Sequence, residues 1–462
     1  MKHNERKNRM EIKTNYFKMT ASIVLMTLIC SISVDAQITP DRVAAAVEKT
    51  RTNLNEMDAE NEFNGAVLIA EHDRILFQQA YGYTDENKEV PNTVDTTFEI
   101  ASMGKMFTAV SIMQLQERGL LQLDNTIGEI LPNYPNKDAR EKITIKQLLS
   151  HTSGLGDFFS KEFFEKPEGA IQELNDILPF FVNDPLEFVP GESFRYSNAG
   201  FIVLGLIIEK LTKQSYNSYV QQNIFKPTNI SSTIKLSSSA GGGRLTLTDL
   251  HKFAISLKSN KLISVKSFNL MTTDSFNNQY GLGLSLNTIN GIEIYGHNGG
   301  APGVSGEVDI TKHTPIILIS LSNRSAMEGW AQVRTFIRNE FFGETKESIQ
   351  LVNTDEVIKT YKEKGFDLAK EKLNKLNNNI SDKNTFHYAQ QYLHQQEFEK
   401  AIDVMRLILE AYSNDWFPYS YLADIYHKSG QKEKAIVNYK KSLDINAENQ
   451  HAIEQLALIE NK

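Results

Sequence analysis

Two strand-like runs, separated by about 240 residues of mainly helical pattern, most restrict what this chain can fold into. The apolar segment 65–70 and the run ILFQQAYGY enclose a short polar turn, a pattern typical of a β-hairpin. The run PIILISLS at 315–322 is continuously apolar and indicates a further strand. Between them, residues 106–113 carry apolar side chains at helical spacing, and 201–208 is apolar on every side. This order predicts an α/β (α+β) domain, with an antiparallel sheet flanked by helices and an all-helical subdomain.

The character of the chain changes after about Phe342, where strand signals vanish and Lys and Glu become frequent. Several residues there recur after 34 positions: Ala389 and Ala423, Tyr392 and Tyr426, Ala401 and Ala435, and Leu422-Ala423 and Leu456-Ala457. A small residue followed one helical turn later by an aromatic residue, recurring every 34 positions, resembles the pattern of tetratricopeptide repeats. We therefore expect a helical linker over 346–380 and repeats over 381–462, following the α/β domain over 37–345.

The first 36 residues have the pattern of a secretory signal peptide. Basic residues up to Lys18 precede an apolar run from about Met19 to Val34, and Val34-Asp35-Ala36 places small residues for cleavage after Ala36. A membrane anchor is the alternative, but the run is shorter than the ~20 apolar residues of a spanning helix. The mature protein is therefore expected to be periplasmic or secreted.

Composition excludes several function classes. One cysteine rules out a disulfide framework and any four-thiolate metal site. The net charge of −8 gives no support to nucleic-acid binding. Neither H-E-x-x-H nor G-x-x-x-x-G-K-[ST] occurs, so we expect no metal and no cofactor.

Three short motifs could carry chemistry. Ser102-Met103-Gly104-Lys105 is an S-x-x-K tetrad at the start of a predicted helix. Residues three apart share a helix face, so the Lys105 amine can reach the Ser102 hydroxyl. Tyr196-Ser197-Asn198 offers a phenol and an amide on one short turn, and His297-Asn298-Gly299-Gly300 opens a Gly-rich loop after a strand-like stretch.

The order of these motifs resembles the serine β-lactamase and penicillin-binding-protein superfamily, whose signature is S-x-x-K, S/Y-x-N and K/H-x-G. The likeness is greatest to the branch of class C β-lactamases, D-alanyl-D-alanine carboxypeptidases and esterases, where Tyr begins the middle motif. Longer phrases agree, among them TTFEIASMGKMFTA, TIKQLLSHTSGLGD, PGESFRYSNAG, AGGGRLTLTD and YGHNGGAPGVSG. The similarity covers residues 40–343.

The resemblance implies a role for each motif residue. Ser102 would be the nucleophile that forms an acyl-enzyme, Lys105 would accept or relay its proton, and Tyr196 would share that role. Because a phenol of pKa ~10 acts as a base only beside cations, Lys105 is expected to supply one. Asn198 would hydrogen-bond the substrate amide and Lys105. The backbone N–H groups of Ser102 and Gly300 would form the oxyanion hole.

The third motif departs from the family pattern. His297 stands where a permanently charged Lys is common, and Asn298 stands where Thr or Ser binds the substrate carboxylate; Gly299 and Gly300 complete the motif. At a reference pKa of ~6.5, His297 would be charged in a minority of molecules at neutral pH and in more of them near pH 6. We therefore expect neutral esters to be favoured over carboxylate-bearing β-lactams. His151 is expected to be structural.

We predict an exported serine hydrolase acting on D-alanyl peptides, β-lactams or small esters and amides. The alternative is a catalytically silent ligand-binding or scaffold protein that acts through its repeats. The expected partners are a small-molecule or peptide substrate and, through the repeats, a protein or a second copy of the chain.

Overall fold

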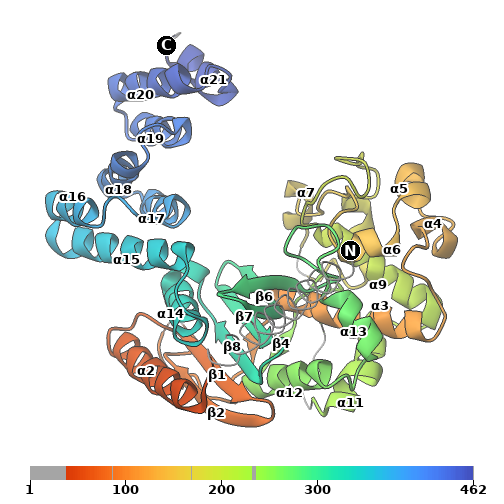
Figure 1. Ribbon diagram of the computed structural model, residues 1–462. Coiled ribbons are helices and arrows are strands. Elements are labelled where there is room, and N and C mark those ends of the chain that lie inside the picture. The colour runs from red at the N-terminus through yellow and green to blue at the C-terminus, as the bar shows by residue number, and fades with distance from the viewer. Residues whose placement is uncertain (1–37, 86, 168, 231–235, 461–462) are drawn as a thin grey trace, which may run out of the picture. The chain divides into compact units, whose positions relative to one another are not determined.

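A computed structural model describes residues 38–460 apart from positions 86, 168 and 231–235 (Figure 1). The predicted signal peptide over 1–36 lies outside the described residues. The chain divides after Phe342 into two compact units. Within the described part of the chain, none of the helices combines the length and the apolar character that crossing a bilayer requires.

The first unit is built on a six-stranded antiparallel sheet in the order β2-β1-β8-β7-β6-β5. Its strands are β1 (Gly65–Glu71), β2 (Arg74–Tyr81), β5 (Ser285–Ile289), β6 (Ile292–Ala301), β7 (Val304–Thr311) and β8 (Ile316–Ser322). The hairpin β1–β2 lies beside β8, although some 240 residues separate them along the chain, and Gly65 pairs with Ser322. A separate two-stranded sheet pairs β3 (Phe98–Glu99) with β4 (Arg244–Leu245).

Helices cover both faces of the large sheet, which explains the continuous apolar runs of its central strands. On β1, Ala66 and Leu68 belong to one apolar cluster, whereas Val67 and Ile69 belong to the other. Successive side chains of a strand point to opposite faces, so a strand covered on both faces has no polar alternation. The predicted antiparallel sheet flanked by helices is confirmed.

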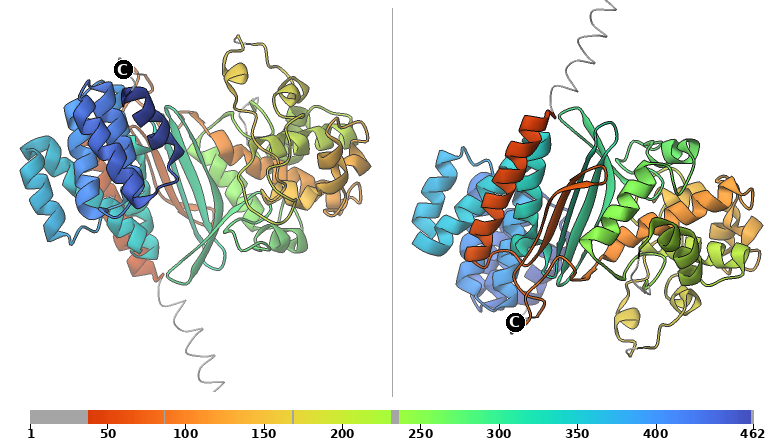
Figure 2. Two further views of the ribbon diagram at one scale, coloured as in Figure 1. Left: turned by 90° about the horizontal axis from the view of Figure 1, so that it is seen from above. Right: turned by 90° about the horizontal axis from the view of Figure 1, so that it is seen from below.

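The outer face carries two long helices, and the other face carries the rest (Figure 2). The outer helices are α2 (Pro40–Ala59) and α14 (Ala331–Phe342). The largest helices of the opposite face are α3 (Lys105–Glu117), α9 (Asn198–Thr212), α12 (Leu247–Lys258) and α13 (Val265–Met271). Both predicted buried helices are confirmed: the apolar side chains of 106–113 and 201–208 are inaccessible or nearly so.

Shorter helical turns complete the helical side. The α-helical turns are α4 (Ile127–Ile130), α5 (Lys137–Lys142), α6 (Ile145–Leu149), α7 (Lys161–Phe164), α8 (Leu174–Ile177), α10 (Tyr216–Val220) and α11 (Lys226–Thr228). The 3₁₀ and π turns are η1 (Ala101–Gly104), η2 (Leu178–Phe180), η3 (Gln221–Phe225) and η4 (Ala326–Trp330). Side-chain oxygens cap many of these starts; Thr144 and Gln147, for example, form a reciprocal capping box at α6.

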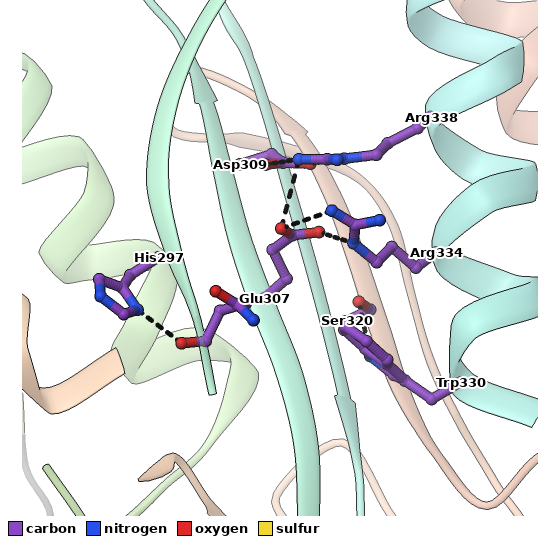
Figure 3. Close-up of polar contacts among 8 residues, drawn as sticks. His297, Glu307, Asp309, Ser320, Trp330, Arg334 and Arg338 are labelled. Atoms are coloured by element: carbon purple, nitrogen blue, oxygen red, sulfur yellow. Dashed lines mark hydrogen bonds and ion pairs between the residues drawn. The ribbon is translucent and has the colours of Figure 1, made fainter. Parts of the chain in front are cut away.

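A cluster of buried ion pairs joins the sheet to α14 (Figure 3). Arg338 donates to both oxygens of Asp309 on β7, at 2.6 and 2.7 Å, and Arg334 makes a bidentate contact with Glu307. His297 lies on the opposite side of the sheet from these arginines. Two arginines against two carboxylates leave no uncompensated buried charge in the cluster, which fixes α14 on β7.

The second unit is helical. Its helices are α15 (Lys346–Lys364), α16 (Phe366–Lys375), α17 (Asp382–His394), α18 (Phe398–Ala411), α19 (Trp416–Lys428), α20 (Lys432–Ile445) and α21 (Gln450–Glu460). The starts of α17, α19 and α21 are 34 residues apart, as are those of α18 and α20. Residues 346–380, expected as a linker, contain α15 and α16, which share a small apolar core with α18. The tetratricopeptide assignment stays a prediction.

Candidate active site

The turn η1 presents Ser102 in a backbone conformation that its neighbours hold in place. Ala101 has a φ of +43°, in the left-handed region that side-chain-bearing residues rarely adopt. Its N–H donates to Glu99 Oε1 at 3.2 Å, and its carbonyl accepts from Gly242 N–H at 2.9 Å. Gly241 must lack a side chain, because a Cβ there would lie 2.3 Å from the Ala101 oxygen. The segment AGGGR therefore supports the turn that carries Ser102.

Lys105 begins α3 directly after that turn, and its amine meets three oxygen acceptors. Nζ donates to Ser102 Oγ at 3.1 Å, to Asn198 Oδ1 at 2.7 Å and to the Ala240 carbonyl at 2.5 Å. The S-x-x-K spacing thus does what the helix geometry predicts, since residues i and i+3 lie on one face. Asn198, from the second motif, lies at the start of α9, 93 residues further along the chain.

Burial changes the acid–base behaviour of this amine. The side chain of Lys105 is inaccessible to solvent, and this burial lowers its pKa to about 7, although the Asp157 carboxylate acts in the opposite direction. Desolvation penalises the ammonium form and leaves the free amine unaffected. About half of the Lys105 side chains therefore hold a free lone pair at pH 7, where an exposed lysine would hold almost none.

Asn198 is oriented by Asp157. The Asn198 Nδ2 donates to Asp157 Oδ2 at 2.7 Å, and the Asn198 backbone N–H donates to the same oxygen at 3.2 Å. Ser197 caps α9 and donates from its hydroxyl to the Gly156 carbonyl at 2.7 Å. With its Nδ2 engaged by a carboxylate, Asn198 turns its carbonyl oxygen toward Lys105.

The Tyr196 ring packs against the His151 ring in a tilted arrangement beside the amine. Their ring centroids are 4.1 Å apart, and Lys105 Nζ lies 4.9 Å from the Tyr196 ring centroid. His151 Nδ1 accepts from the Ser197 N–H at 3.1 Å, and this hydrogen bond fixes the backbone of the second motif. The Tyr196 hydroxyl is buried and has no hydrogen-bond partner among the described residues.

The expectation that a Lys105 cation would make Tyr196 a base is wrong for the free protein. Burial raises the pKa of Tyr196 above its ordinary value, the nearby Ser102 hydroxyl only partly opposes this, and Asp157 raises the pKa further. Burial thus favours the neutral form of both groups, the free amine of Lys105 and the protonated phenol of Tyr196. These pKa directions favour a neutral phenol and make the Lys105 amine the better candidate for the base.

His297 is buried beneath the site rather than displayed in it. Its side chain is 2% exposed; Nε2 lies 2.8 Å from the Tyr280 hydroxyl and Nδ1 lies 2.5 Å from the Asn298 carbonyl. Burial, followed by the Lys105 charge, lowers the pKa of His297 to about 4, although the Asn298 carbonyl and Glu307 act in the opposite direction. The expected gain of His297 charge near pH 6 is therefore wrong: the ring is neutral throughout that range.

The residues after His297 form a hairpin, not the predicted loop. β6 continues through Asn298, Gly299 and Gly300 to Ala301, and β7 begins at Val304. Gly299 allows this because β6 passes the chain just before η1; a Cβ at 299 would lie 2.2 Å from the Ile100 carbonyl oxygen. Asn298 and Gly300 are exposed, whereas Gly299 is buried. Glycine has two uses in this segment: Gly303 takes a φ of +71° in the turn between the strands, and Gly299 allows close approach of two backbones.

The structure thus brings Ser102, Lys105, Tyr196 and Asn198 together and places His297 behind them. Sequence reasoning missed Asp157, Tyr280 and Glu99. Asp157 and Glu99 stand in phrases that carry the resemblance, so a signal was present for these two, but no spacing argument links them to the motif residues. Among the described residues, no group of three or more His, Cys, Asp or Glu side chains is placed to hold a metal ion.

Comparison with known proteins gives consistent matches to one family. A family model described as Beta-lactamase matches residues 50–339. Penicillin-binding protein 4* of Bacillus subtilis is 34% identical over 185 residues, which is 40% of each chain. Protein flp of Staphylococcus aureus is 35% identical over 170 residues, 36% of this chain and 34% of that protein. This chain thus matches less than half the length of these relatives.

A solved structure extends the match to the fold. The crystal structure of a penicillin-binding protein from Bacillus halodurans is 27% identical, with a TM-score of 0.54, and the match covers 60% of this chain and 98% of that one.

Proposed function

The chain belongs to the beta-lactamase family, whose members are serine hydrolases, and we propose that it hydrolyses small carboxylic esters and amides through an acyl-enzyme on Ser102. One observation carries the proposal: a fully buried Lys105 amine with a pKa of about 7 lies 3.1 Å from the Ser102 hydroxyl. A serine needs a base to become a nucleophile, and an amine whose pKa is near the working pH is well matched to that task.

In the first half-reaction, Lys105 Nζ accepts the Ser102 proton while Oγ attacks the substrate carbonyl carbon. The negative charge that develops on the carbonyl oxygen is stabilised by backbone N–H donors, for which Ser102 and Gly300 are the candidates. When the tetrahedral intermediate collapses, the leaving group takes a proton that Lys105 supplies directly or through the Tyr196 hydroxyl. The acyl group then remains on Ser102 as an ester.

In the second half-reaction, water replaces the leaving group. Lys105, again a free amine, accepts a proton from the water, whose oxygen attacks the acyl carbon. Collapse of the second tetrahedral intermediate returns the proton to Ser102 Oγ and releases a carboxylic acid. Because Asn198 is held by Asp157 and Lys105, its role here is to orient the amine.

The third motif supports neutral substrates. With a pKa of about 4, His297 offers no positive charge to a substrate carboxylate at neutral pH. Asn298 can donate a hydrogen bond, but it adds no charge. We therefore infer that neutral esters and amides are turned over better than carboxylate-bearing β-lactams or D-alanyl peptides.

Export and the role of the repeats are also part of the proposal. The basic and apolar pattern of residues 1–36 supports a cleaved leader and a periplasmic or secreted protein. The 34-residue recurrence of helix starts supports tetratricopeptide repeats that bind a peptide or a second copy of the chain.

The test uses the full chain with a fluorescent penicillin, a fluorophosphonate probe and p-nitrophenyl acetate. We expect fluorophosphonate labelling and ester turnover, both lost in Ser102→Ala. A matched control is Ser111→Ala, which changes a buried serine of α3 that donates to its own helix. Wild-type turnover in Ser102→Ala would overturn the proposal.

A further inference from the structure

Tyr280 lies in the buried layer under the motif residues. Its ring centroid lies 4.6 Å from that of His151 and 5.7 Å from that of His297, and its hydroxyl lies 2.8 Å from His297 Nε2. His151 fixes the backbone of the second motif, and His297 begins the third. Tyr280 therefore contacts a support of one motif and the first residue of the next, although it belongs to neither.

The loop that carries Tyr280 is packed against two helices. Tyr280 is 5% exposed and stands between α13 and β5. Three residues later, the Gly283 N–H donates to the Leu149 carbonyl of α6 at 2.9 Å. Gly283 also passes close to α3, because a Cβ there would lie 2.2 Å from the Ala109 Cβ. The Tyr280 hydroxyl is therefore held in place relative to the helix that begins at Lys105.

The hydrogen bonds of His297 determine which of its nitrogens carries the proton. Nδ1 lies 2.5 Å from the Asn298 carbonyl oxygen, which can only accept, so Nδ1 is protonated and donates (Figure 3). In the neutral ring, Nε2 then has a lone pair, and the Tyr280 hydroxyl is its donor at 2.8 Å. Burial, followed by Tyr196, raises the pKa of Tyr280 well above its ordinary value, so the phenol keeps its proton. A charged ring would donate from both nitrogens, and the Tyr280 proton would need another acceptor in a buried layer.

The bond from Nδ1 restrains a flexible part of β6. β5 pairs with β6 as far as Gly296, and β7 alone among the described strands continues beside β6 to Ala301. This part contains Gly299 and Gly300, whose backbones have more conformational freedom than those of other residues. The Gly300 N–H is a candidate donor of the oxyanion hole, and it belongs to the peptide group next to the one that Nδ1 contacts. The orientation of the His297 ring therefore bears on the direction of the Gly300 N–H.

We propose that Tyr280 is a positioning residue: its hydroxyl donates to Nε2 of His297 and thereby fixes the ring that orients the Gly300 N–H toward the developing oxyanion. This inference rests on the proposed hydrolysis at Ser102. It gives the uncharged third motif a use, because the ring serves as a donor to the strand rather than as a cation for a substrate carboxylate. The effect of Tyr280 passes through His297, so its hydroxyl should matter only while His297 is present.

The kinetic experiment removes the hydroxyl and keeps the ring. In the full chain, Tyr280→Phe should lower kcat for p-nitrophenyl acetate by about tenfold and leave KM within about twofold, because the oxyanion develops only in the transition state. Loss of an oxyanion donor costs about a hundredfold or more in kcat, and misalignment of one should cost less. The control Tyr219→Phe removes the hydroxyl of another buried tyrosine, which donates to Gln114 at 3.2 Å. Gln114 lies about 13 Å beyond Lys105 along α3, so neither constant should change.

A double variant tests whether Tyr280 acts through His297. Tyr280→Phe should cost about tenfold in kcat in the wild-type background and little when His297→Gln is already present. An unchanged kcat in Tyr280→Phe, a loss confined to KM, or equal losses in both backgrounds would overturn the positioning role.

Nitrogen NMR of the histidine-labelled full chain separates this inference from the proposed function, because it requires no turnover. The signals that are missing in His297→Gln identify the ring. At pH 7.5 we expect a protonated Nδ1 and an unprotonated Nε2, whose signal moves in Tyr280→Phe. This result would support the hydrogen-bond arrangement even if no ester were hydrolysed, a failure that would contradict the proposed function alone. A proton on Nε2 of the wild type, or an Nε2 signal that stays in place in Tyr280→Phe, would overturn the inference whatever the kinetics show.

Discussion

Replacing Asp157 by Asn should move the pH at which the enzyme becomes active to a lower value. Asp157 raises the pKa of Lys105 against the larger effect of burial. Its charge reaches Lys105 through the Asn198 amide, along two hydrogen bonds of 2.7 Å, so the two charges are within about 8 Å. The substitution keeps a side-chain oxygen that can accept from Asn198 Nδ2. We therefore expect the orientation of Asn198 to be retained.

The size of the shift follows from Coulomb's law. At an effective dielectric constant of about 20, a unit charge about 8 Å away contributes about 2 kcal/mol. That energy corresponds to about 1.5 pKa units. The active form has a free amine, so kcat/KM rises with pH through the pKa of Lys105 and levels off above it. In Asp157→Asn the ammonium loses a stabilising charge, and the rising limb should move from about pH 7 to lower pH by about one unit or more.

The assay measures kcat/KM for p-nitrophenyl acetate between pH 5 and pH 9, because this neutral ester does not titrate. Asp138→Asn removes an exposed carboxylate from α5 and should leave the limb in place. If kcat/KM rises at the same pH in wild type and Asp157→Asn, or at a higher pH in the variant, Lys105 is not the group whose deprotonation limits the rate.

Four other predictions concern the motif residues and the division of the chain into two units. Alanine at Ser102, Lys105 or Tyr196 should each abolish most ester turnover, and double variants should lose little more, because the three act as a unit; additive losses in kcat/KM would contradict this. Lys105→Met should gain more in Tm over wild type at pH 6.5 than at pH 9: the pKa of Lys105 is lower in the folded chain than in the unfolded one, so its contribution to stability rises with pH between about 7 and 10. Because the pKa of His297 is about 4, the ratio of p-nitrophenyl acetate to nitrocefin turnover in the wild type should stay constant from pH 7.5 to pH 6. His297→Lys should lower this ratio. A wild-type ratio that decreases between pH 7.5 and pH 6 would show instead that His297 becomes charged in that range. A chain limited to residues 37–345 should fold and hydrolyse p-nitrophenyl acetate, and an insoluble or inactive product would show that the second unit completes the first.

Local patterns in the sequence were sufficient to predict the main strands and helices of the first unit and the contact between Lys105 and Ser102. The continuous apolar runs of β1 and β8 indicated strands, and the spacing of 106–113 indicated the helix that begins at Lys105. The contact between Lys105 and Ser102 followed as well, because three residues along a helix are a fixed geometric relation. Resemblance of the motifs added Tyr196 and Asn198 to that pair, which no spacing rule could do.

Protonation was decided only by the tertiary structure. A reference pKa describes a side chain in water, whereas Lys105, His297 and the hydroxyl of Tyr196 are buried. Desolvation acts on the charged form of each, so it lowers the pKa of the amine and the imidazole and raises that of the phenol. These directions favour the amine over the phenol as the base and leave the imidazole neutral, contrary to what the residue types alone indicated. Burial depends on segments distant in sequence, such as 151–157 and 240–243, and a local pattern contains no information on where such segments meet.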